Sequence, residues 1–210
     1  LNFDNTDIDA GSLPSREISD FLTSEGTIFD VLKAQAVWSR ITLNRGMFPT
    51  YGSSTDVMLQ ATIPGSDLTY YKTNIRQKFY RPIGFSNLVF GFTGELGYID
   101  TYGDTKKTPF FENFYSGGPR SIRGFESNTL GPRVTPSPCY NFDPVTEECP
   151  LLIDTDFDGT PDSIGQNPYV YQQARDPIGG NFLVEGSLQL IFKLPIIEDQ
   201  RSMRSAFFLD

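Results

Sequence analysis

Residues 70–80 read Tyr70-Tyr71-Lys72-Thr73-Asn74-Ile75-Arg76-Gln77-Lys78-Phe79-Tyr80, and this stretch indicates the architecture of the chain. Side chains of a β-strand point alternately to its two faces, so alternation of period two predicts a half-buried strand. One face carries Tyr71, Thr73, Ile75, Gln77 and Phe79. The other carries Lys72, Asn74, Arg76 and Lys78 between two tyrosines. Four strongly polar side chains cannot point at lipid, so the second face must meet water.

The same alternation recurs along the chain. Residues 88–99 place Leu88, Phe90, Phe92, Leu96 and Tyr98 on one side. Residues 181–194 place apolar side chains on one side and Glu185, Ser187, Gln189 and Lys193 on the other. A shorter alternation covers 55–64, and weaker ones cover 29–43 and 202–210. These patterns predict an all-β, antiparallel chain of about six strands.

The predicted connections alternate in length. The connections at 44–54, 81–87 and 195–201 are short and lie at one end of the strands. The segments at the other end are 1–27, 64–69 and 100–180, and the last of these is very long. Outer-membrane β-barrels have short periplasmic turns and longer external loops, and a soluble β-sandwich is not expected to sort its loops in this way. We therefore predict part of one transmembrane β-barrel domain. Residues 1–27 form an external loop, 28–99 four strands, 100–180 a long external loop and 181–210 two strands.

Six strands are too few to close this barrel. An open sheet in lipid would expose unpaired backbone groups that hydrocarbon cannot satisfy. We therefore expect the chain to be a partial barrel, belonging to a larger one. The N-terminus, Leu1-Asn2-Phe3-Asp4, shows no basic stretch and no apolar segment of a signal peptide, which suits a mature chain, a trimmed one or part of a longer protein.

The composition narrows the functional classes. The 210 residues include 17 Lys and Arg against 26 Asp and Glu, a formal charge of −9, which argues against a nucleic-acid partner. Hydrophobic content is 38% and aromatic content 14%, which fits alternate lipid-facing residues and aromatic girdles; a soluble all-β domain is the alternative. No apolar run is long enough for a transmembrane helix. The chain has no His, so an ordinary catalytic triad is excluded, and we expect no enzyme.

Two features of the 100–180 segment suggest special chemistry. Cys139 and Cys149 lie in a Pro-rich stretch and predict a disulfide in an oxidising compartment. Further on, the spacing of four aspartates around a glycine matches the first half of a calcium loop, although the Glu that closes an EF-hand is missing. The candidate Ca²⁺ ligands are Asp154, Asp156, Asp158 and Asp162. The alternative is a solvated acidic turn.

Residues 109–125 read Pro109-Phe110-Phe111-Glu112-Asn113-Phe114-Tyr115-Ser116-Gly117-Gly118-Pro119-Arg120-Ser121-Ile122-Arg123-Gly124-Phe125. This segment resembles the long loop of the BamA family of outer-membrane proteins, which carries a hydrophobic-Arg-Gly-Phe motif after a glycine pair. Residues 44–50, 63–67 and 126–132 and the cysteine pair resemble the same family in the same order. The resemblance runs from about residue 18 to residue 210 and rests on four ordered blocks.

The resemblance implies that the long loop folds back into the barrel lumen. Its Arg, here Arg123, would bind acidic residues on the inner wall, since a guanidinium in a polar lumen needs a carboxylate of matching geometry. Gly124 would permit a tight turn and Phe125 would pack against the wall. The alternative is that Arg123 caps an ordinary turn.

The acidic partners follow from the same resemblance. Asp210 matches one family position and should face inward. A second family position is Gln189 here, a departure that weakens the second pairing. Glu185 lies on the same face four residues earlier and is the candidate substitute.

The resemblance implies a membrane insertase of the barrel assembly machinery, which folds and inserts β-barrel proteins into the bacterial outer membrane. Nascent barrels would pair with an exposed strand edge by β-augmentation, at a seam expected to lie outside these residues. The expected partners are nascent outer-membrane barrels, the lipoproteins of the machinery (through domains outside this sequence) and outer-membrane lipid, and no cofactor is required.

Two other functions stay open. One is a two-partner secretion pore or related transporter of the same superfamily, which shares the loop motif; the blocks at 44–50 and 125–132 favour the BamA family. The other is a secreted calcium-binding β domain, which predicts solubility without detergent and melting that depends on calcium.

Overall fold

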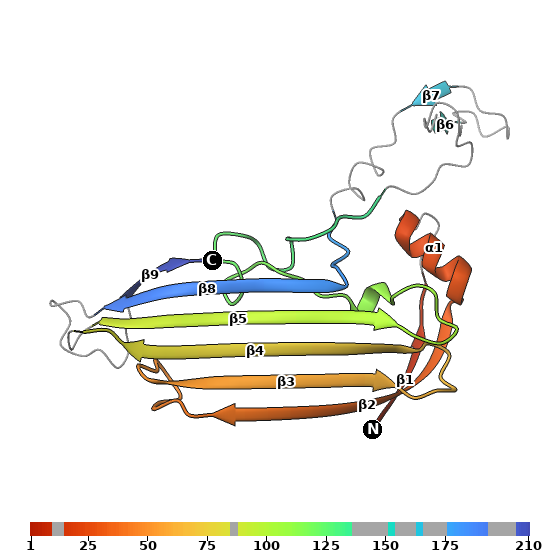
Figure 1. The fold of residues 1–210 in the computed structure, drawn as a ribbon. Coiled ribbons are helices and arrows are strands. Elements are labelled where there is room, and N and C mark those ends of the chain that lie inside the picture. Colours follow the sequence, from red (N-terminus) through yellow and green to blue (C-terminus); the bar gives the residue numbers. More distant parts are fainter. Residues whose placement is uncertain (10–14, 85–87, 136–150, 154–162, 166–175, 193–204) are drawn as a thin grey trace.

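The computed structural model describes residues 1–9, 15–84, 88–135, 151–153, 163–165, 176–192 and 205–210. Seven strands form one antiparallel sheet in the order β1-β2-β3-β4-β5-β8-β9 (Figure 1). They are β1 (Asn2–Asp7), β2 (Ile28–Ile41), β3 (Gly52–Thr62), β4 (Tyr70–Pro82), β5 (Leu88–Thr101), β8 (Phe182–Phe192) and β9 (Ser205–Leu209). The short strands β6 (Leu151–Ile153) and β7 (Ser163–Gly165) pair with each other. The predicted all-β antiparallel sheet is confirmed.

The register places side chains on the two faces as the period-two pattern predicts. Arg76 of β4 lies opposite Glu95 of β5, and its guanidinium donates two hydrogen bonds to that carboxylate at 2.8 and 2.9 Å. Lys72, on the same face of β4, contacts the long loop. We call this polar face the inner face, because the long loop lies against it.

The opposite, outer face is apolar and uncovered. Its exposed side chains include Trp38, Leu59, Ile75, Leu96, Val184 and Leu188. Aromatic rings meet near both ends of the strands. Tyr98 contacts Tyr71 and Phe182 at centroid distances of 6.1 and 6.4 Å, and Phe192 stacks on Phe207 at 5.1 Å. An apolar band between aromatic girdles is the outer surface of a barrel that faces lipid.

The prediction of an external loop over residues 1–27 is wrong, and the sheet has seven strands rather than about six. Residues 2–7 form β1, which pairs with β2, and residues 16–25 form the helix α1 (Arg16–Glu25). The period-two pattern does not indicate β1, because this strand carries polar residues on both faces. Ile18, Phe21 and Leu22 do follow helical spacing, but over too short a stretch to stand out. No helix in the described ranges is both long and apolar enough to cross a membrane.

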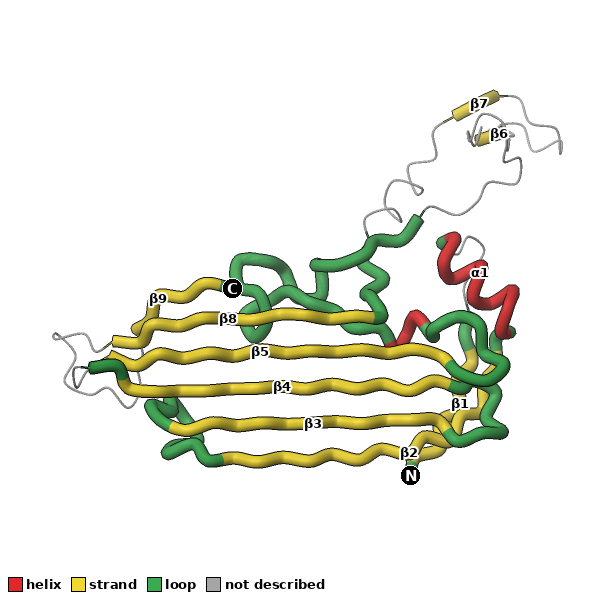
Figure 2. The backbone as a smooth tube through the Cα atoms, viewed as in Figure 1, coloured by secondary structure: helices red, strands yellow, loops and turns green. Residues whose placement is uncertain are grey.

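Helix α1 lies at one end of the sheet (Figures 1 and 2) and packs Phe21 against the inner face there. The helix ends at Glu25. The Gly26 N–H donates to the Leu22 carbonyl at 3.0 Å, and the φ of 103° at Gly26 turns the chain out of the helix. The ring of Phe21 is 2% exposed and lies edge-on to Phe110 at 5.6 Å. The buried cluster at this end comprises Phe21, Phe29, Val31, Leu68, Tyr70 and Ile99. It fixes the short helix η1 (Phe110–Glu112), and with it the start of the long loop.

Candidate functional site

The candidate site is the contact between the long loop and the inner face. Its centre is Arg123, which forms charged hydrogen bonds to Asp210. The Arg123 side chain donates to both carboxylate oxygens of Asp210, from Nε at 2.8 Å and from Nη2 at 2.5 Å. The Arg123 backbone N–H donates to Asp210 Oδ2 at 2.9 Å. The Asp210 side chain is 5% exposed, so this charge has little water to compensate it. A two-pronged contact of this kind fixes orientation as well as position.

Two further wall residues hold the same guanidinium, and the sequence reasoning missed both in this role. Ser187 of β8 accepts a hydrogen bond from Arg123 Nη2 at 2.6 Å. The ring of Phe208 lies under the guanidinium, 3.7 Å from its central carbon, in a cation–π contact. Hydrogen bonding to Asp210 raises the pKa of Arg123 above its ordinary value, so the cation persists at any physiological pH.

Glu185 also contacts the loop, but through hydroxyl groups rather than through the Arg123 guanidinium. Its Oε2 accepts hydrogen bonds from Ser116 at 2.8 Å and from Ser121 at 2.5 Å. The proposed substitution of Glu185 for the second acidic partner is therefore corrected. The guanidinium donates to Ser187 and Asp210, whereas Glu185 lies among the loop serines.

The motif residues after Arg123 behave differently from one another. Gly124 has a φ of 88°, a conformation that residues with a Cβ rarely adopt, which agrees with the tight turn expected there. The packing of Phe125 against the wall stays a prediction, and among the described residues Phe125 is 53% exposed. Arg123 lies at the wall, and the ring that contacts its guanidinium belongs to Phe208.

The two ends of the long loop pair with each other above β5. Phe114 and Gly180 exchange two backbone hydrogen bonds of 2.9 Å, and Asn113 Nδ2 donates to the Ile178 carbonyl at 3.0 Å. Gly117 and Gly118 also lie where the neighbouring loop segment leaves no room for a side chain. Both have a φ of 105°, and a Cβ on either would lie 2.6 Å from an atom of the neighbouring loop segment. The loop is thus an ordered structure within its described part.

A polar cavity of about 850 Å³ lies between the loop and the inner face. Its lining includes Arg76, Lys78, Glu95, Arg120, Glu185 and Gln189. Charges of both signs line a water-accessible space, as expected for the lumen of an outer-membrane barrel.

Comparison with known proteins shows which family this chain belongs to. The family model described as the Omp85 superfamily domain matches residues 1–210. The chain belongs to the Omp85 superfamily. It is 32% identical over 179 residues to the outer membrane protein assembly factor BamA of Neisseria meningitidis serogroup B. That alignment covers 85% of this chain and 18% of the relative, so the chain spans less than a fifth of that protein.

A solved structure gives the same result for the fold of this Omp85 chain. The crystal structure of BamA from Haemophilus ducreyi lacking POTRA domains 1–3 matches with a TM-score of 0.70 and 26% identity. The match covers 92% of this chain and 34% of that one. The predicted resemblance to the BamA family and the partial-barrel fold are confirmed, and the compartment is the bacterial outer membrane.

Two predicted features of the Omp85 chain lie outside the described residues. The cysteine pair, Cys139 and Cys149, falls within 136–150, and the aspartates of the candidate Ca²⁺ site fall within 154–162. The disulfide and the Ca²⁺ site therefore stay predictions.

Proposed function

We propose that this chain is part of a membrane insertase that folds and inserts β-barrel proteins into the bacterial outer membrane. The observation that supports the proposal is the long loop tied to the inner wall by Arg123 and Asp210, in a chain similar to a protein named as an assembly factor. The anchored loop would keep the wall in one shape while strands are added elsewhere on the barrel.

The process that we propose needs no catalytic group and no cofactor. A nascent strand gains backbone hydrogen bonds when it pairs with an existing strand edge, and no covalent bond is made or broken. The partners would be nascent outer-membrane barrels, the lipoproteins of the assembly machinery and the surrounding lipid. The apolar outer face supports the contact with lipid.

Depletion of the full-length protein in its source bacterium tests this function. We expect folded, heat-modifiable barrels of many kinds to decline together, and the wild-type gene to restore them. A transporter of the same superfamily would instead lose one exported partner while other barrels kept their levels. That second outcome would replace the insertase with the secretion pore.

The secreted calcium-binding domain loses its support, because the family match extends over the whole chain. A calcium site in an external loop of a barrel is a separate matter and is compatible with the Omp85 fold.

A further inference from the structure

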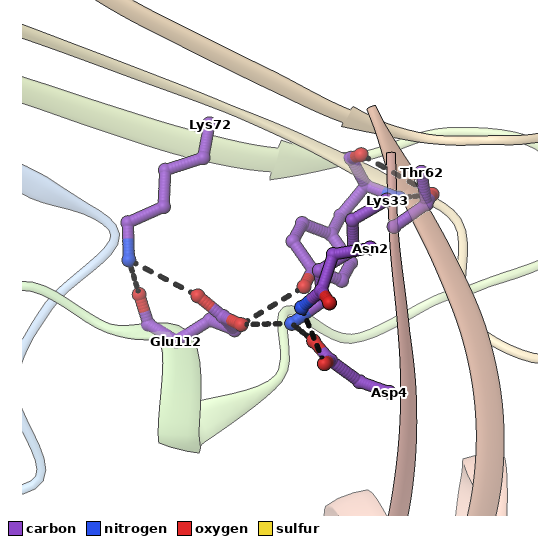
Figure 3. A network of polar contacts seen from close by, with 7 residues as sticks. Asn2, Asp4, Lys33, Thr62, Lys72 and Glu112 are labelled. Carbon is purple, nitrogen blue, oxygen red and sulfur yellow. Dashed lines mark hydrogen bonds and ion pairs between the residues drawn. The ribbon is translucent and has the colours of Figure 1, made fainter. Parts of the chain in front are cut away.

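Glu112 ends η1, and its carboxylate meets side chains from two strands of the inner face. Its Oε1 accepts hydrogen bonds from Lys33 Nζ at 2.6 Å and from the Tyr70 hydroxyl at 3.0 Å. Lys72 Nζ donates to Oε2 at 3.2 Å and to the backbone carbonyl of Glu112 at 2.7 Å. Figure 3 shows Lys33 and Lys72 reaching the glutamate from two sides. One loop residue thereby joins β2 and β4, which are not neighbours in the sheet.

The charges in this cluster balance, and most of them are shielded from water. Lys33 also pairs with Asp4 of β1 at 2.9 Å, so two ammonium groups face two carboxylates. The side chains of Lys33, Lys72 and Glu112 are 15%, 15% and 17% exposed, so salt screens these pairs less than exposed ones. Burial opposes ionisation of Glu112, but hydrogen bonding and charge from the two lysines outweigh it and lower the pKa of its carboxyl.

Successive contacts of the loop follow the order of the strands across the sheet. The loop therefore runs across the strands rather than along them, with an ion pair at each end. In sequence order the contacts are Glu112 with β2 and β4, Phe114 on Gly97 of β5, Ser116 and Ser121 with Glu185 of β8, and Arg123 with Ser187 of β8 and with Asp210 after β9.

We propose that residues 112–123 form a transverse brace on the inner wall, and that Glu112 is its first anchor. Glu112 is a positioning residue, which ties the start of the loop to β2 and β4 as Arg123 ties its other end to β8 and β9. Among the residues that the structure describes, the two anchors have different partners. A segment held at both ends keeps each anchor close to its partner, so loss of either one loosens the segment between them. The brace concerns the wall of this chain alone and does not depend on insertion activity.

Hydrogen exchange of the full-length protein in lipid nanodiscs tests the brace with Glu112→Gln, which removes the charge and keeps the shape. The reporters are the amides of Phe114 and Gly180, whose N–H groups bond across the loop. We expect their protection factors to fall about tenfold, as when a charge-assisted contact next to a local opening is lost. Glu126→Gln is the matched control, since it makes the same change at an exposed position of the same loop and should leave both amides unchanged.

The pH dependence and a second variant, Lys72→Met, show whether Glu112 acts through its charge or only through the volume of its side chain. The difference in protection between wild type and Glu112→Gln should be complete at neutral pH. It should be lost only as the pH falls through the pKa of the Glu112 carboxyl, which lies below its ordinary value. Lys72→Met should cost less protection in the Glu112→Gln background than in wild type. Wild-type protection in Glu112→Gln, an equal loss in Glu126→Gln, or a difference that is constant with pH would each overturn the proposal.

Discussion

The ring of Phe114 lies directly on the backbone of Gly97. A Cβ placed on Gly97 would be 2.7 Å from the nearest ring carbon, closer than side-chain carbons approach one another. Phe114 belongs to the loop and Gly97 to the inner face of β5, so the missing side chain creates the space in which the loop crosses the wall. Lys72 completes the site, with its Nζ 4.8 Å from the centre of the same ring.

Gly97→Ala should therefore displace Phe114 and weaken the loop contact. We expect the free energy of unfolding to fall by about 1–3 kcal/mol, the usual cost of overpacking a filled site. The midpoint of heat-modifiability of the full-length protein measures this. Gly186→Ala is the control, because a Cβ there meets nothing closer than 3.8 Å. If both alanine variants melt alike, the close approach of Phe114 has no energetic weight.

Glu17 should make the attachment of α1 sensitive to pH. Burial alone would raise the pKa of its carboxyl, but hydrogen bonds from the hydroxyl and N–H of Thr135 lower it below the ordinary value. A carboxyl whose pKa is lowered by folding stabilises the fold at pH values above its ordinary pKa. This stabilisation is lost as the pH falls through the lowered pKa of the folded state. Because Glu17 is only partly buried and solvent screens its contacts, we expect less than about 1 kcal/mol.

Exchange of the α1 amides between about pH 6 and pH 3 measures the effect, after correction for the intrinsic rate. Protection should decline with acid in wild type and stay level in Glu17→Gln. An identical decline in the two proteins would show that another group controls α1.

The sequence predicted the strands and their faces well, because lipid on one side and water on the other impose strict alternation. β4 begins at Tyr70 as predicted, and its polar face is the inner one. Phe208 shares a face with Asp210, so the aromatic contact of Arg123 was within reach of the period-two rule.

Other features could not be read from local pattern. Glu112 meets Lys33 and Lys72 across separations of 79 and 40 residues, and only the path of the loop brings them together. β1 carries polar residues on both faces, so alternation does not indicate this strand.

The cysteines give a prediction for residues outside the described ranges. If Cys139 and Cys149 are bridged, Cys139→Ser should cost about 2–3 kcal/mol at most, since the bridge closes a short loop. Thiol titration of the native full-length protein under denaturing, non-reducing conditions is the measurement. Detection of two free thiols would refute the bridge.

The aspartate-rich segment predicts a response to calcium. Chelation should speed proteolysis of the long loop near residues 154–162, and Asp156→Asn should make cleavage independent of added Ca²⁺. Asp104→Asn, in the same connection but outside the motif, is the control. Cleavage at one rate with and without Ca²⁺ in the wild-type protein would favour the solvated acidic turn.

A double-mutant cycle on Arg123 and Asp210 tests the anchored loop most directly. Arg123→Ala, Asp210→Ala and the double variant would be compared in the full-length protein by the midpoint of heat-modifiability. We expect each single change to cost about 3 kcal/mol, because it leaves a shielded charge unpaired, and the double change to cost no more than either. Arg123→Lys, which keeps the charge but not the fork, should fall between wild type and Arg123→Ala. Additive losses, or single variants as stable as wild type, would contradict the anchor.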